Sequence, residues 1–460
     1  MNIKKWRSNY CNSYLIKELK MGCFGLIYLN DSSFQYSQIN IGITSICTFL
    51  QKNGHEVFLF DTFYQTEEEI VKACTRLCLD LVGFSTTEIH SEKAFRIAKE
   101  IQSHQKSKII FGGPFPTIFP HDILSKEYID YVCVGDGEYP LNDFLNGKSP
   151  LAIKGILGKN TARQNGVSKP FDINEIQVLD YSFFNRNSIV TSRKFGSVQK
   201  KIAFSWSSRG CSFSCAYCSN NELKQTLKYG VRYRNIDFLL KEINELKEGY
   251  NCKGIFLSDE NFLFNKKHCC QFAEKYLHKK VGIPFGFLTR PEHICRKNIE
   301  RLKLLRKSGW TWVSIGIEIG NQEKRKEYLN RNNTNNEIEI AFHICKELGV
   351  HTNAFLITGF DFDDVNDLLL TEQLLKTCKP DSVESSIIFP LKGTRLYQHY
   401  NKNNLLLKNK KTQSTKSYFE DIVIRHPIFS ESKLLKIKKY WEQLPKEQYR
   451  DDTTILEVLN

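Results

Sequence analysis

Three cysteines close together in the middle of the chain carry the clearest chemical signature in the sequence. Cys211, Cys215 and Cys218 are spaced C-x3-C-x2-C, and three thiolates on one short segment can hold a metal centre. A cubane iron–sulfur cluster normally takes four thiolates, so three of them leave one iron open. An open iron can chelate a small molecule through an amine and a carboxylate, much as a catalytic zinc site keeps one position free. The spacing therefore predicts a 4Fe-4S cluster with a catalytic role.

A structural zinc site is the alternative interpretation of these cysteines. Zinc sites usually combine a C-x2-C pair with a second pair or with histidines, and the sequence near residue 218 offers neither. Cys269 and Cys270 are adjacent on a predicted helix, so their side chains point apart. Isolated cysteines usually behave as small buried hydrophobes. We expect this of the cysteines in the second half of the chain, namely Cys252, Cys269, Cys270, Cys295, Cys345 and Cys378.

The elements that must position the cysteine loop form a series of strand–helix units within residues 200–400. The predicted strands are 202–206, 254–257, 285–288, 310–317, 353–357 and 385–389. The predicted helices between them are 236–246, 266–277, 299–307, 337–348 and 365–377. Six such units predict a partial (β/α)6 barrel with an all-parallel sheet, whose active residues lie at the carboxyl ends of the strands. The cysteine loop follows the first of these strands.

Residues 22–148 show a separate α/β alternation. The predicted strands are 25–29, 56–60, 81–84, 108–111 and 131–134, and the predicted helices are 41–51, 67–77 and 91–102. This order predicts a doubly wound, Rossmann-like parallel sheet, which binds ligands at the carboxyl ends of its strands. Those ends are marked by small or polar residues, namely Ser85, Thr86, Gly112, Gly113, Gly135, Gly137 and Glu138.

The remaining segments complete the predicted organisation. Residues 149–199 show no sustained period and are interpreted as a connector. Residues 401–460 are charged and form a C-terminal helical extension, with a predicted helix start near Ser430.

Size and composition limit the class of protein. The chain has 460 residues, 15 cysteines and a formal net charge of +14. Two or three domains are expected at this length, and scattered cysteines in an odd number do not suit a secreted disulfide scaffold. The sequence contains no apolar run that would span a bilayer or serve as a secretory signal, so we expect a cytoplasmic protein. Because the lysines are spread along the chain, the charge is interpreted as a solvated surface rather than a nucleic-acid site.

The cysteine spacing, the aromatic Tyr217 before the third cysteine and the six-unit barrel together resemble the radical S-adenosylmethionine (SAM) superfamily. The resemblance covers about residues 200–400. It implies a cluster that cleaves SAM by one-electron reduction and yields a 5′-deoxyadenosyl radical. It also implies SAM contacts near the strand ends, namely Tyr217, Asp259, Glu260, Arg290, Gly316, Glu318 and Gly359. Taken singly, each charged residue is as well explained by surface charge or a structural ion pair. The acidic residue expected after the fifth-strand glycine is displaced, with Asp361, Asp363 and Asp364 as candidates.

The first series resembles the cobalamin-binding domain that is fused to one large class of radical SAM enzymes. The resemblance implies that the strand-end residues named above approach a cobalamin; a nucleotide-binding or ligand-free domain is the alternative. The D-x-H-x-x-G motif of many cobalamin proteins is missing, because Asp31-Ser32-Ser33 contains no histidine. Its absence implies that no imidazole of this loop binds cobalt. His90 is interpreted as a surface or helix-start histidine.

Together the two resemblances imply a cobalamin-dependent radical SAM methyltransferase that acts on an unactivated carbon of a small-molecule or natural-product substrate. One SAM would methylate cobalt and a second would yield the radical, with electrons from a reductant such as flavodoxin or ferredoxin. The same motifs fit an oxidative cyclase or a ring-rearranging enzyme. A non-catalytic cofactor-binding or sensory protein is the rival of another class, against which the intact cysteines argue. An RNA-modifying enzyme is disfavoured, since residues 401–460 lack the pattern of an RNA-binding barrel.

Overall fold

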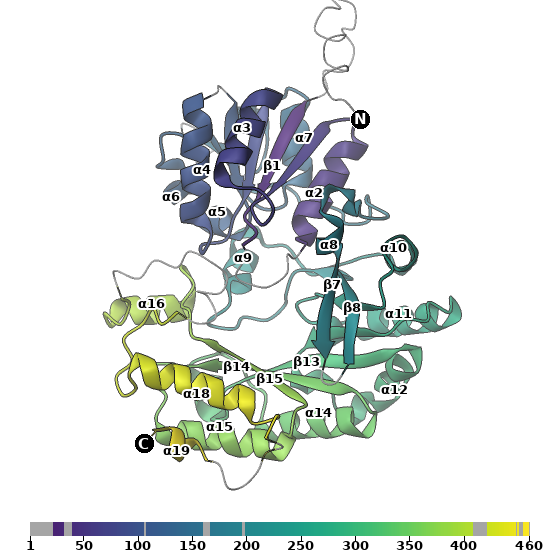
Figure 1. The fold of residues 1–460 in the computed structure, drawn as a ribbon, viewed down its shortest axis with the longest axis vertical. Helices are drawn as coiled ribbons and strands as arrows, with labels where there is room; N and C mark the ends of the chain where they lie inside the picture. Colours follow the sequence, from purple (N-terminus) through teal and green to yellow (C-terminus); the bar gives the residue numbers. More distant parts are fainter. Residues whose placement is uncertain are drawn as a thin grey trace, which may run out of the picture.

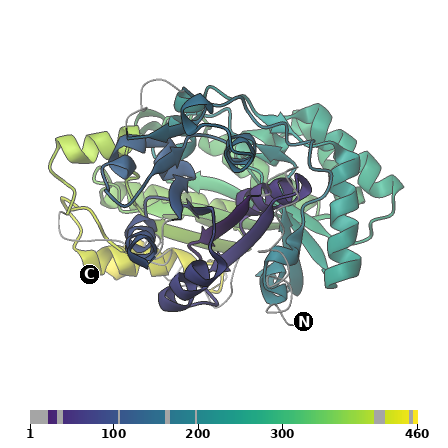
Figure 2. The ribbon, with the colours of Figure 1, turned by 90° about the horizontal axis from the view of Figure 1, so that it is seen from above.

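The computed structural model describes residues 22–31, 39–104, 107–159, 166–195, 198–407, 421–447, 449 and 454–459. These residues form two α/β domains, each built on one large sheet (Figure 1). Seen from above, the first domain overlies the sheet of the second (Figure 2). No helix in the described ranges is long and apolar enough to cross a membrane.

The first domain is a sheet with helices on both faces, as predicted. The order of its described strands is β2-β1-β3-β4-β5-β6. Their bounds are β1 Cys23–Tyr28, β2 Glu56–Asp61, β3 Leu81–Ser85, β4 Lys108–Gly112, β5 Tyr131–Cys133 and β6 Ile156–Gly158. The helices are α2 Ile41–Lys52, α3 Glu67–Leu77, α4 Ser91–His104, α5 Pro114–Ile118, α6 Pro120–Leu124 and α7 Glu138–Leu145. Helices α2 and α7 pack into one core cluster, while α3 and α4 pack into another on the opposite face.

The second domain is an incomplete barrel whose described strands have the order β15-β14-β13-β12-β11-β8-β7. The strands are β7 Val190–Phe195, β8 Val198–Ser205, β11 Gly254–Leu257, β12 Phe285–Thr289, β13 Trp310–Glu318, β14 His351–Thr358 and β15 Ser382–Ile387. The covering helices are α10 Ile236–Tyr250, α11 Lys266–His278, α12 Ile299–Ser308, α14 Asn335–Glu347 and α15 Val365–Cys378. The strands β8 to β15 run parallel in chain order, which confirms the six predicted units.

Shorter elements complete the second domain and the segment before it. Two short strands pair antiparallel, β9 Ser208–Arg209 and β10 Arg232–Tyr233. The remaining helices are α8 Arg186–Ile189, α9 Ser219–Leu227, α13 Gln322–Glu327, α16 Arg395–Lys402, α18 Glu431–Gln443 and α19 Ile455–Leu459. The 3-10 turns are η1 Pro150–Ala152, η2 Tyr181–Phe183, η3 Phe262–Phe264, η4 Pro291–His293 and η5 Arg296–Asn298.

The segment 149–199 is more than a connector. Its strand β6 pairs antiparallel with β5, and its strand β7 pairs antiparallel with β8, so it adds one edge strand to each sheet. The strands that the sequence predicts are parallel in both sheets, whereas these two antiparallel edge strands were not predicted. Strand β6 is buried but spans only three residues, and β7 has the polar centre Thr-Ser-Arg-Lys. Neither segment therefore carries the longer apolar run by which the parallel strands were recognised. Residues 160–165 and 196–197 lie outside the described ranges.

Helix α18 packs against β15, the strand at one edge of the second sheet (Figure 1). Ser430 starts it, since its side chain accepts a hydrogen bond from the Lys433 N–H at 3.3 Å. The predicted helix start is thus confirmed, whereas residues 408–420 of the expected helical extension lie outside the described part of the chain.

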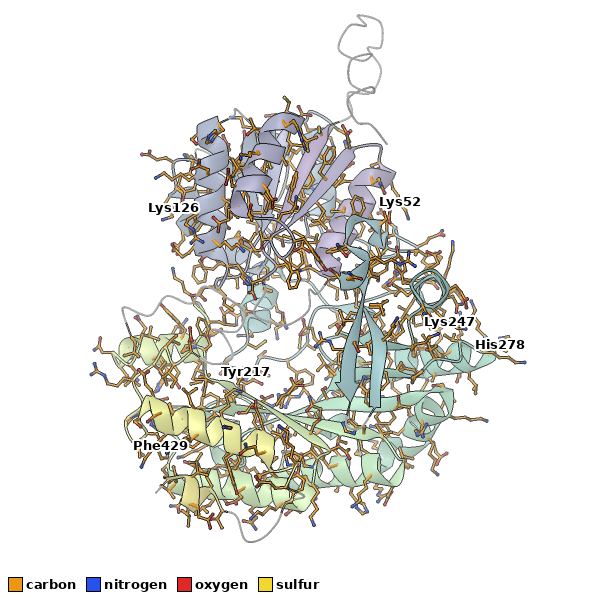
Figure 3. The ribbon with its side chains drawn as sticks, in the orientation of Figure 1. Lys52, Lys126, Tyr217, Lys247, His278 and Phe429 are labelled. Atoms are coloured by element: carbon orange, nitrogen blue, oxygen red, sulfur yellow. The ribbon has the colours of Figure 1, made fainter. Side chains whose placement is uncertain are left out.

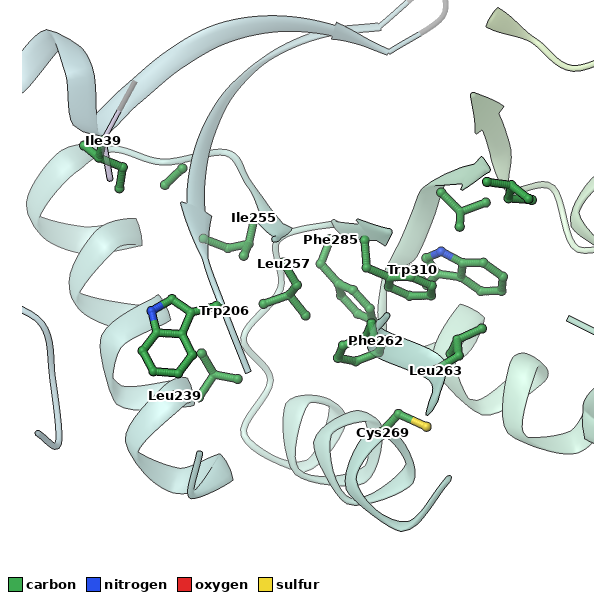
Figure 4. Packing of buried hydrophobic residues seen from close by; sticks show 14 of the residues in the cluster. Ile39, Trp206, Leu239, Ile255, Leu257, Phe262, Leu263, Cys269, Phe285 and Trp310 are labelled. Atoms are coloured by element: carbon green, nitrogen blue, oxygen red, sulfur yellow. The ribbon is translucent and has the colours of Figure 1, made fainter. Parts of the chain in front are cut away.

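Aromatic side chains fill the core beneath the barrel strands. Phe287 stacks on Phe262 at a centroid distance of 4.5 Å and on Trp310 at 5.2 Å. Phe262, Phe285 and Trp310 lie side by side in this core (Figure 4). Of the cysteines predicted to be packing residues, Cys252, Cys269, Cys345 and Cys378 are buried, whereas Cys270 and Cys295 are half-buried.

A buried ion pair joins helix α10 to the segment that precedes the barrel. Glu242 accepts hydrogen bonds from the Arg234 guanidinium at 2.8 and 3.1 Å, from Tyr181 Oη at 2.9 Å and from the Leu179 N–H at 3.1 Å. Burial alone would raise the pKa of Glu242, but the neighbouring Arg234 charge and these hydrogen bonds bring it below its usual value. The pair therefore remains charged and fixes the chain just before the first barrel strand.

We expect Glu242→Leu to destabilise the protein by about 3–5 kcal/mol, because it leaves the buried Arg234 charge without its partner. Chemical denaturation followed by tryptophan fluorescence measures the change. Glu347→Ala is the matched control, since its partner Arg296 forms a surface ion pair and its loss should leave the midpoint unchanged. Equal shifts for the two variants would contradict the assignment.

Candidate active site at the cysteine loop

The cysteine loop connects β9 to α9, and Cys211, Cys215 and Cys218 are all half-buried. Two later segments of the barrel hold its middle residue in place. The Ala216 N–H donates to the Leu329 carbonyl at 3.0 Å, and the Ala216 carbonyl accepts from the Leu396 N–H at 3.0 Å. The loop is therefore positioned by the segments that follow β13 and β15, as expected at the carboxyl ends of barrel strands.

The three thiols lie within electrostatic reach of one another. Burial raises the pKa of Cys218 to about 12, and the neighbouring Glu260, Cys215 and Cys211 add to the rise. Burial likewise raises the pKa of Cys211. Within the described residues, no three His, Cys, Asp or Glu side chains stand close enough to share one metal ion. Cysteines of a cubane bind separate irons, so such a cluster does not require the three thiols to surround one metal ion. Binding of a cluster would displace the thiol protons.

Arg290 also lies at this loop. Its Nη1 atom donates a hydrogen bond to Cys215 Sγ at 3.4 Å, although Arg290 follows β12 and stands 75 residues away in sequence. The sequence predicts a contact with SAM for this residue, whereas its partner in the structure is a cysteine of the loop.

The two predicted acids after β11 differ in their surroundings. Asp259 is buried, and its carboxylate accepts hydrogen bonds from the Ser207 N–H at 2.9 Å, from Ser207 Oγ at 2.7 Å and from Ser208 Oγ. It thus fixes the chain just before the cysteines. Glu260 is reached by solvent, yet the protein around it raises its pKa through desolvation. Since its charge also acts on Cys211 and Cys218, Glu260 is the acid available to a ligand at the cysteines.

Arg331, which the sequence analysis missed, links Tyr217 to Glu318. Arg331 Nη1 donates to Tyr217 Oη at 3.1 Å and to Glu318 Oε1 at 2.9 Å, while its Nη2 donates to the Gly316 carbonyl at 2.7 Å. Glu318 has a φ of 70° next to a register shift in β13, and a Cβ atom at Gly316 would collide with its carboxylate. Three predicted residues therefore meet around one buried guanidinium. No sequence motif around residue 331 indicates that Arg331 contacts Tyr217 and Glu318.

The residues after β14 have structural partners. Gly359 has a φ of 91°, and a Cβ atom there would lie 3.2 Å from the Leu434 side chain of α18. Asp361 pairs with His399 Nε2 at 2.8 Å, Asp363 accepts from the Phe360 N–H at 3.1 Å, and Asp364 caps α15. Burial raises the pKa of Asp363 well above its usual value, and the nearby Asp367 adds to the rise. All three candidate acids are thus engaged locally.

In the first domain, the ends of β3 and β4 come together. The Thr86 N–H donates to the Gly112 carbonyl at 2.9 Å. Gly113 has a φ of 98°, and a Cβ atom there would lie 2.8 Å from the Thr86 carbonyl and 3.3 Å from Ser85 Oγ. Only glycine fits this approach without strain. Ser85, Thr86, Gly112 and Gly113 thus form one closely packed strand-end group.

His90 lies beside this group. Its Nε2 atom is 3.0 Å from Asp31 Oδ2, and its Nδ1 atom is 3.1 Å from Thr87 Oγ1. Both ring nitrogens are thus engaged at the start of α4, in agreement with the interpretation of a helix-start histidine. Ser32 and Ser33 of the absent histidine motif fall outside the described residues.

The segment after β5 faces the second domain. Asp136 lies 3.1 Å from Arg209 Nη1, also pairs with Arg232, and accepts from the Phe171 N–H at 2.9 Å. Glu138, only 1% exposed, accepts from Arg209 at 3.1 Å and from Ser45 Oγ at 2.6 Å. We call Asp136, Glu138, Arg209 and Arg232 the interdomain charge cluster. Burial favours a higher pKa for Asp136, but the two guanidinium groups lower it below its usual value.

The two predicted glycines of this segment are packed against protein. A Cβ atom at Gly135 would lie 3.0 Å from Tyr229 Oη, just after α9, and one at Gly137 would lie 3.1 Å from Ile46 of α2. Gly135 and Glu138 therefore contribute to the joint between the domains, which the sequence did not predict, whereas Gly137 packs within the first domain.

A second joint involves the turn after β15. The Lys392 N–H donates to Glu88 Oε2 at 2.8 Å, and its ammonium group pairs with Asp122. A Cβ atom at Gly393 would lie 2.9 Å from the Phe119 ring. The strand ends of the first domain are thus held over the mouth of the barrel at two places. Tyr217 of the cysteine loop lies between the two domains (Figure 3).

Comparison with known proteins agrees with this division. Residues 207–375 match the family model of the radical SAM superfamily, and residues 30–145 match that of the B12 binding domain. An uncharacterized methyltransferase of Pyrococcus horikoshii is 25% identical over 381 residues, which cover 80% of this chain and 79% of the relative. The anaerobic magnesium-protoporphyrin IX monomethyl ester cyclase of Rubrivivax gelatinosus is 24% identical over 77% of this chain and 65% of its own length. The bacteriochlorophyllide d C-8(2)-methyltransferase of Chlorobaculum tepidum is 24% identical over 71% and 69%.

Solved structures share the fold of both domains. The cobalamin-dependent SAM radical enzyme OxsB, with aqua-cobalamin and SAM bound, superposes with a TM-score of 0.71 at 17% identity and covers 95% of this chain and 70% of its own. The radical SAM methyltransferase TsrM from Kitasatospora setae, with cobalamin and a cluster bound, gives a TM-score of 0.66 at 14% identity over 83% and 78%.

The two family matches fall on the two domains described above. The radical SAM match includes the cysteine loop and the strands β11 to β14, and the B12 match includes the strands β2 to β5. The chain therefore carries a B12-binding domain followed by a radical SAM domain.

Proposed function

We propose that the protein is a cobalamin-dependent radical SAM methyltransferase that methylates an unactivated carbon of a small-molecule or natural-product substrate. The observation that carries the proposal is the joint between the domains at the cysteine loop. Arg209, two residues before Cys211, contacts Asp136 and Glu138 at the end of the first sheet. The regions proposed to hold the two cofactors therefore adjoin one interface, as transfer of a methyl group across it requires.

The structural neighbours support methyl transfer more than cyclisation. TsrM and OxsB both cover most of this chain, and TsrM is a radical SAM methyltransferase with cobalamin bound, while OxsB is a cobalamin-dependent SAM radical enzyme. The sequence relatives include both methyltransferases and cyclases, so they do not separate the two activities. Oxidative ring closure with the same cofactors is the second candidate, and its signature is a SAM-dependent product that has gained no methyl group.

The residues at the site suit these cofactors. When bound, the cluster and the corrinoid supply one-electron and methyl-transfer chemistry, respectively. Cys211, Cys215 and Cys218 would hold the cluster. Glu260 would meet the SAM amino group, and Arg331 would hold Tyr217 and Glu318 in position beside its ribose. The strand-end group around Gly113 would let the corrinoid approach the backbone. The two contacts between the domains would exclude water and other hydrogen-atom donors from the space around the radical.

The electron that the cluster needs comes from outside the chain. We propose a cytoplasmic reductant such as flavodoxin or ferredoxin, because cleavage of SAM consumes one electron per radical. We propose that the protein shares the cytoplasm with this reductant.

The direct test of the proposed function is the fate of the SAM methyl group. Protein purified without oxygen, loaded with cluster and hydroxocobalamin and given methyl-labelled SAM and a reductant should transfer label to the corrinoid fraction. Label that stays in SAM under these conditions would exclude methyl transfer. A non-catalytic protein would in addition form no 5′-deoxyadenosine.

We expect Cys215→Ala to lower bound iron well below the roughly four atoms per chain of a complete cubane and to abolish 5′-deoxyadenosine formation. Cys270→Ala is the control, because Cys270 is a half-buried free cysteine of α11. Iron and sulfide assays together with product analysis measure both effects. Full iron content in the Cys215 variant would show that the cluster lies elsewhere.

We also expect Gly113→Ala to lower the corrinoid content at least severalfold while bound iron stays constant, because the new Cβ atom would crowd the Thr86 backbone at φ 98°. Gly147→Ala is the control. It changes another positive-φ glycine that has nothing within 4 Å of the added carbon. Corrinoid absorbance after desalting measures the outcome. Equal loss of corrinoid in both variants would mean that the effect is backbone strain rather than a cobalamin site.

A further inference from the structure

Arg290 contacts the cysteine loop through a geometry that the SAM assignment does not explain. The residue is buried, and its Nη1 atom donates to Cys215 Sγ at 3.4 Å. The carbon of its guanidinium group lies 3.9 Å from the centre of the Phe213 ring, between the first two cysteines. Its Nε atom donates to Glu292. An aromatic face and a carboxylate thus hold this guanidinium against Cys215, one of the proposed cluster ligands.

An aromatic group lies beside this contact. The centre of the Phe213 ring lies 5.7 Å from that of Phe264 and 6.1 Å from that of the His293 ring. Arg290 is only 9% exposed and Cys215 is half-buried, so the guanidinium acts on the sulfur with less screening than a charge at the surface.

A hydrogen bond and a positive charge at a cluster thiolate stabilise the reduced cluster, which carries one more negative charge. Other charges also lie near the loop. The Lys224 ammonium group contacts the loop and the Arg331 charge interacts with Cys215, so both act in the same direction as Arg290. Glu292 partly neutralises Arg290, and Glu260 opposes reduction from the side of Cys211 and Cys218. Backbone N–H groups reach the sulfurs of Cys211 and Cys218, whereas the donor at Cys215 Sγ is the charged side chain of Arg290.

We propose that Arg290 is a positioning residue that raises the reduction potential of the cluster through its positive charge, which its hydrogen bond holds against Cys215. The proposal rests on the cluster assignment alone and does not require methyl transfer. Arg290→Met should make the cluster harder to reduce. At the potential where half of the wild-type clusters are reduced, the ratio of reduced to oxidised cluster should fall roughly tenfold. Arg290→Lys keeps the positive charge but loses the planar guanidinium. Its reduction potential should lie between those of the wild type and Arg290→Met.

The experiment is a redox titration of the reconstituted full-length protein without SAM, monitored by the electron paramagnetic resonance (EPR) signal of the reduced cluster. Arg296→Met serves as the control, because Arg296 pairs with Glu347 at the surface and its loss should leave the potential unchanged. SAM affinity is measured in parallel from the spectral change that SAM causes.

Two outcomes overturn the proposal. An unchanged potential in Arg290→Met with weakened SAM binding would make Arg290 a SAM ligand only. Should the Met variant fail to hold a full cluster, Arg290→Gln keeps a donor without the charge, and a wild-type potential in that variant would equally contradict the proposal. A lower potential in the Met or the Gln variant supports it. Whether the protein transfers methyl groups does not affect the interpretation of either outcome.

Discussion

The two domains are held together by the interdomain charge cluster. Asp136 and Glu138 meet Arg209 and Arg232 with little access to water, and the backbone of Phe171 and the hydroxyl of Ser45 donate further hydrogen bonds to the two carboxylates. A buried group of this kind is specific because removing one member leaves an uncompensated charge, at a cost of about 3–5 kcal/mol. The joint therefore favours one relative placement of the domains.

This constraint reaches the chemistry through one short stretch of chain. Arg209 belongs to β9, which pairs with Arg232 of β10, and the cysteine loop begins directly after β9. Asp259 fixes Ser207 and Ser208 on the other side of Arg209. The start of the loop is thus set both by the first domain and by the end of a barrel strand. Its middle is set by the segments that contact Ala216. A flexible loop could not hold three sulfurs around a cluster while facing a second cofactor.

The features that the sequence predicts well are local ones. Cysteine spacing, buried β-runs and helix caps such as Ser430 are each read within a few residues, and the parallel strands of both domains follow from them. The antiparallel edge strands β6 and β7 were not predicted, because β6 is very short and β7 is polar. The sequence also did not predict which residues far apart in the chain contact one another. The sequence indicates an acid at a strand end, yet only the fold reveals that Glu138 turns to Arg209 and that Asp259 turns to its own loop. No sequence feature indicated Arg331, because its role depends on contacts with Tyr217, Gly316 and Glu318, which lie in other segments of the chain.

The central claim is that the joint brings a cobalamin and an iron–sulfur cluster to one interface. The most direct measurement is EPR of protein that holds both the reduced cluster and cobalt(II) cobalamin, compared with protein that holds each alone. The account predicts that each signal is broadened or split by the other and that the coupling weakens in Arg209→Met, which loosens the joint. A spectrum of the doubly loaded protein that equals the sum of the two singly loaded spectra would contradict it.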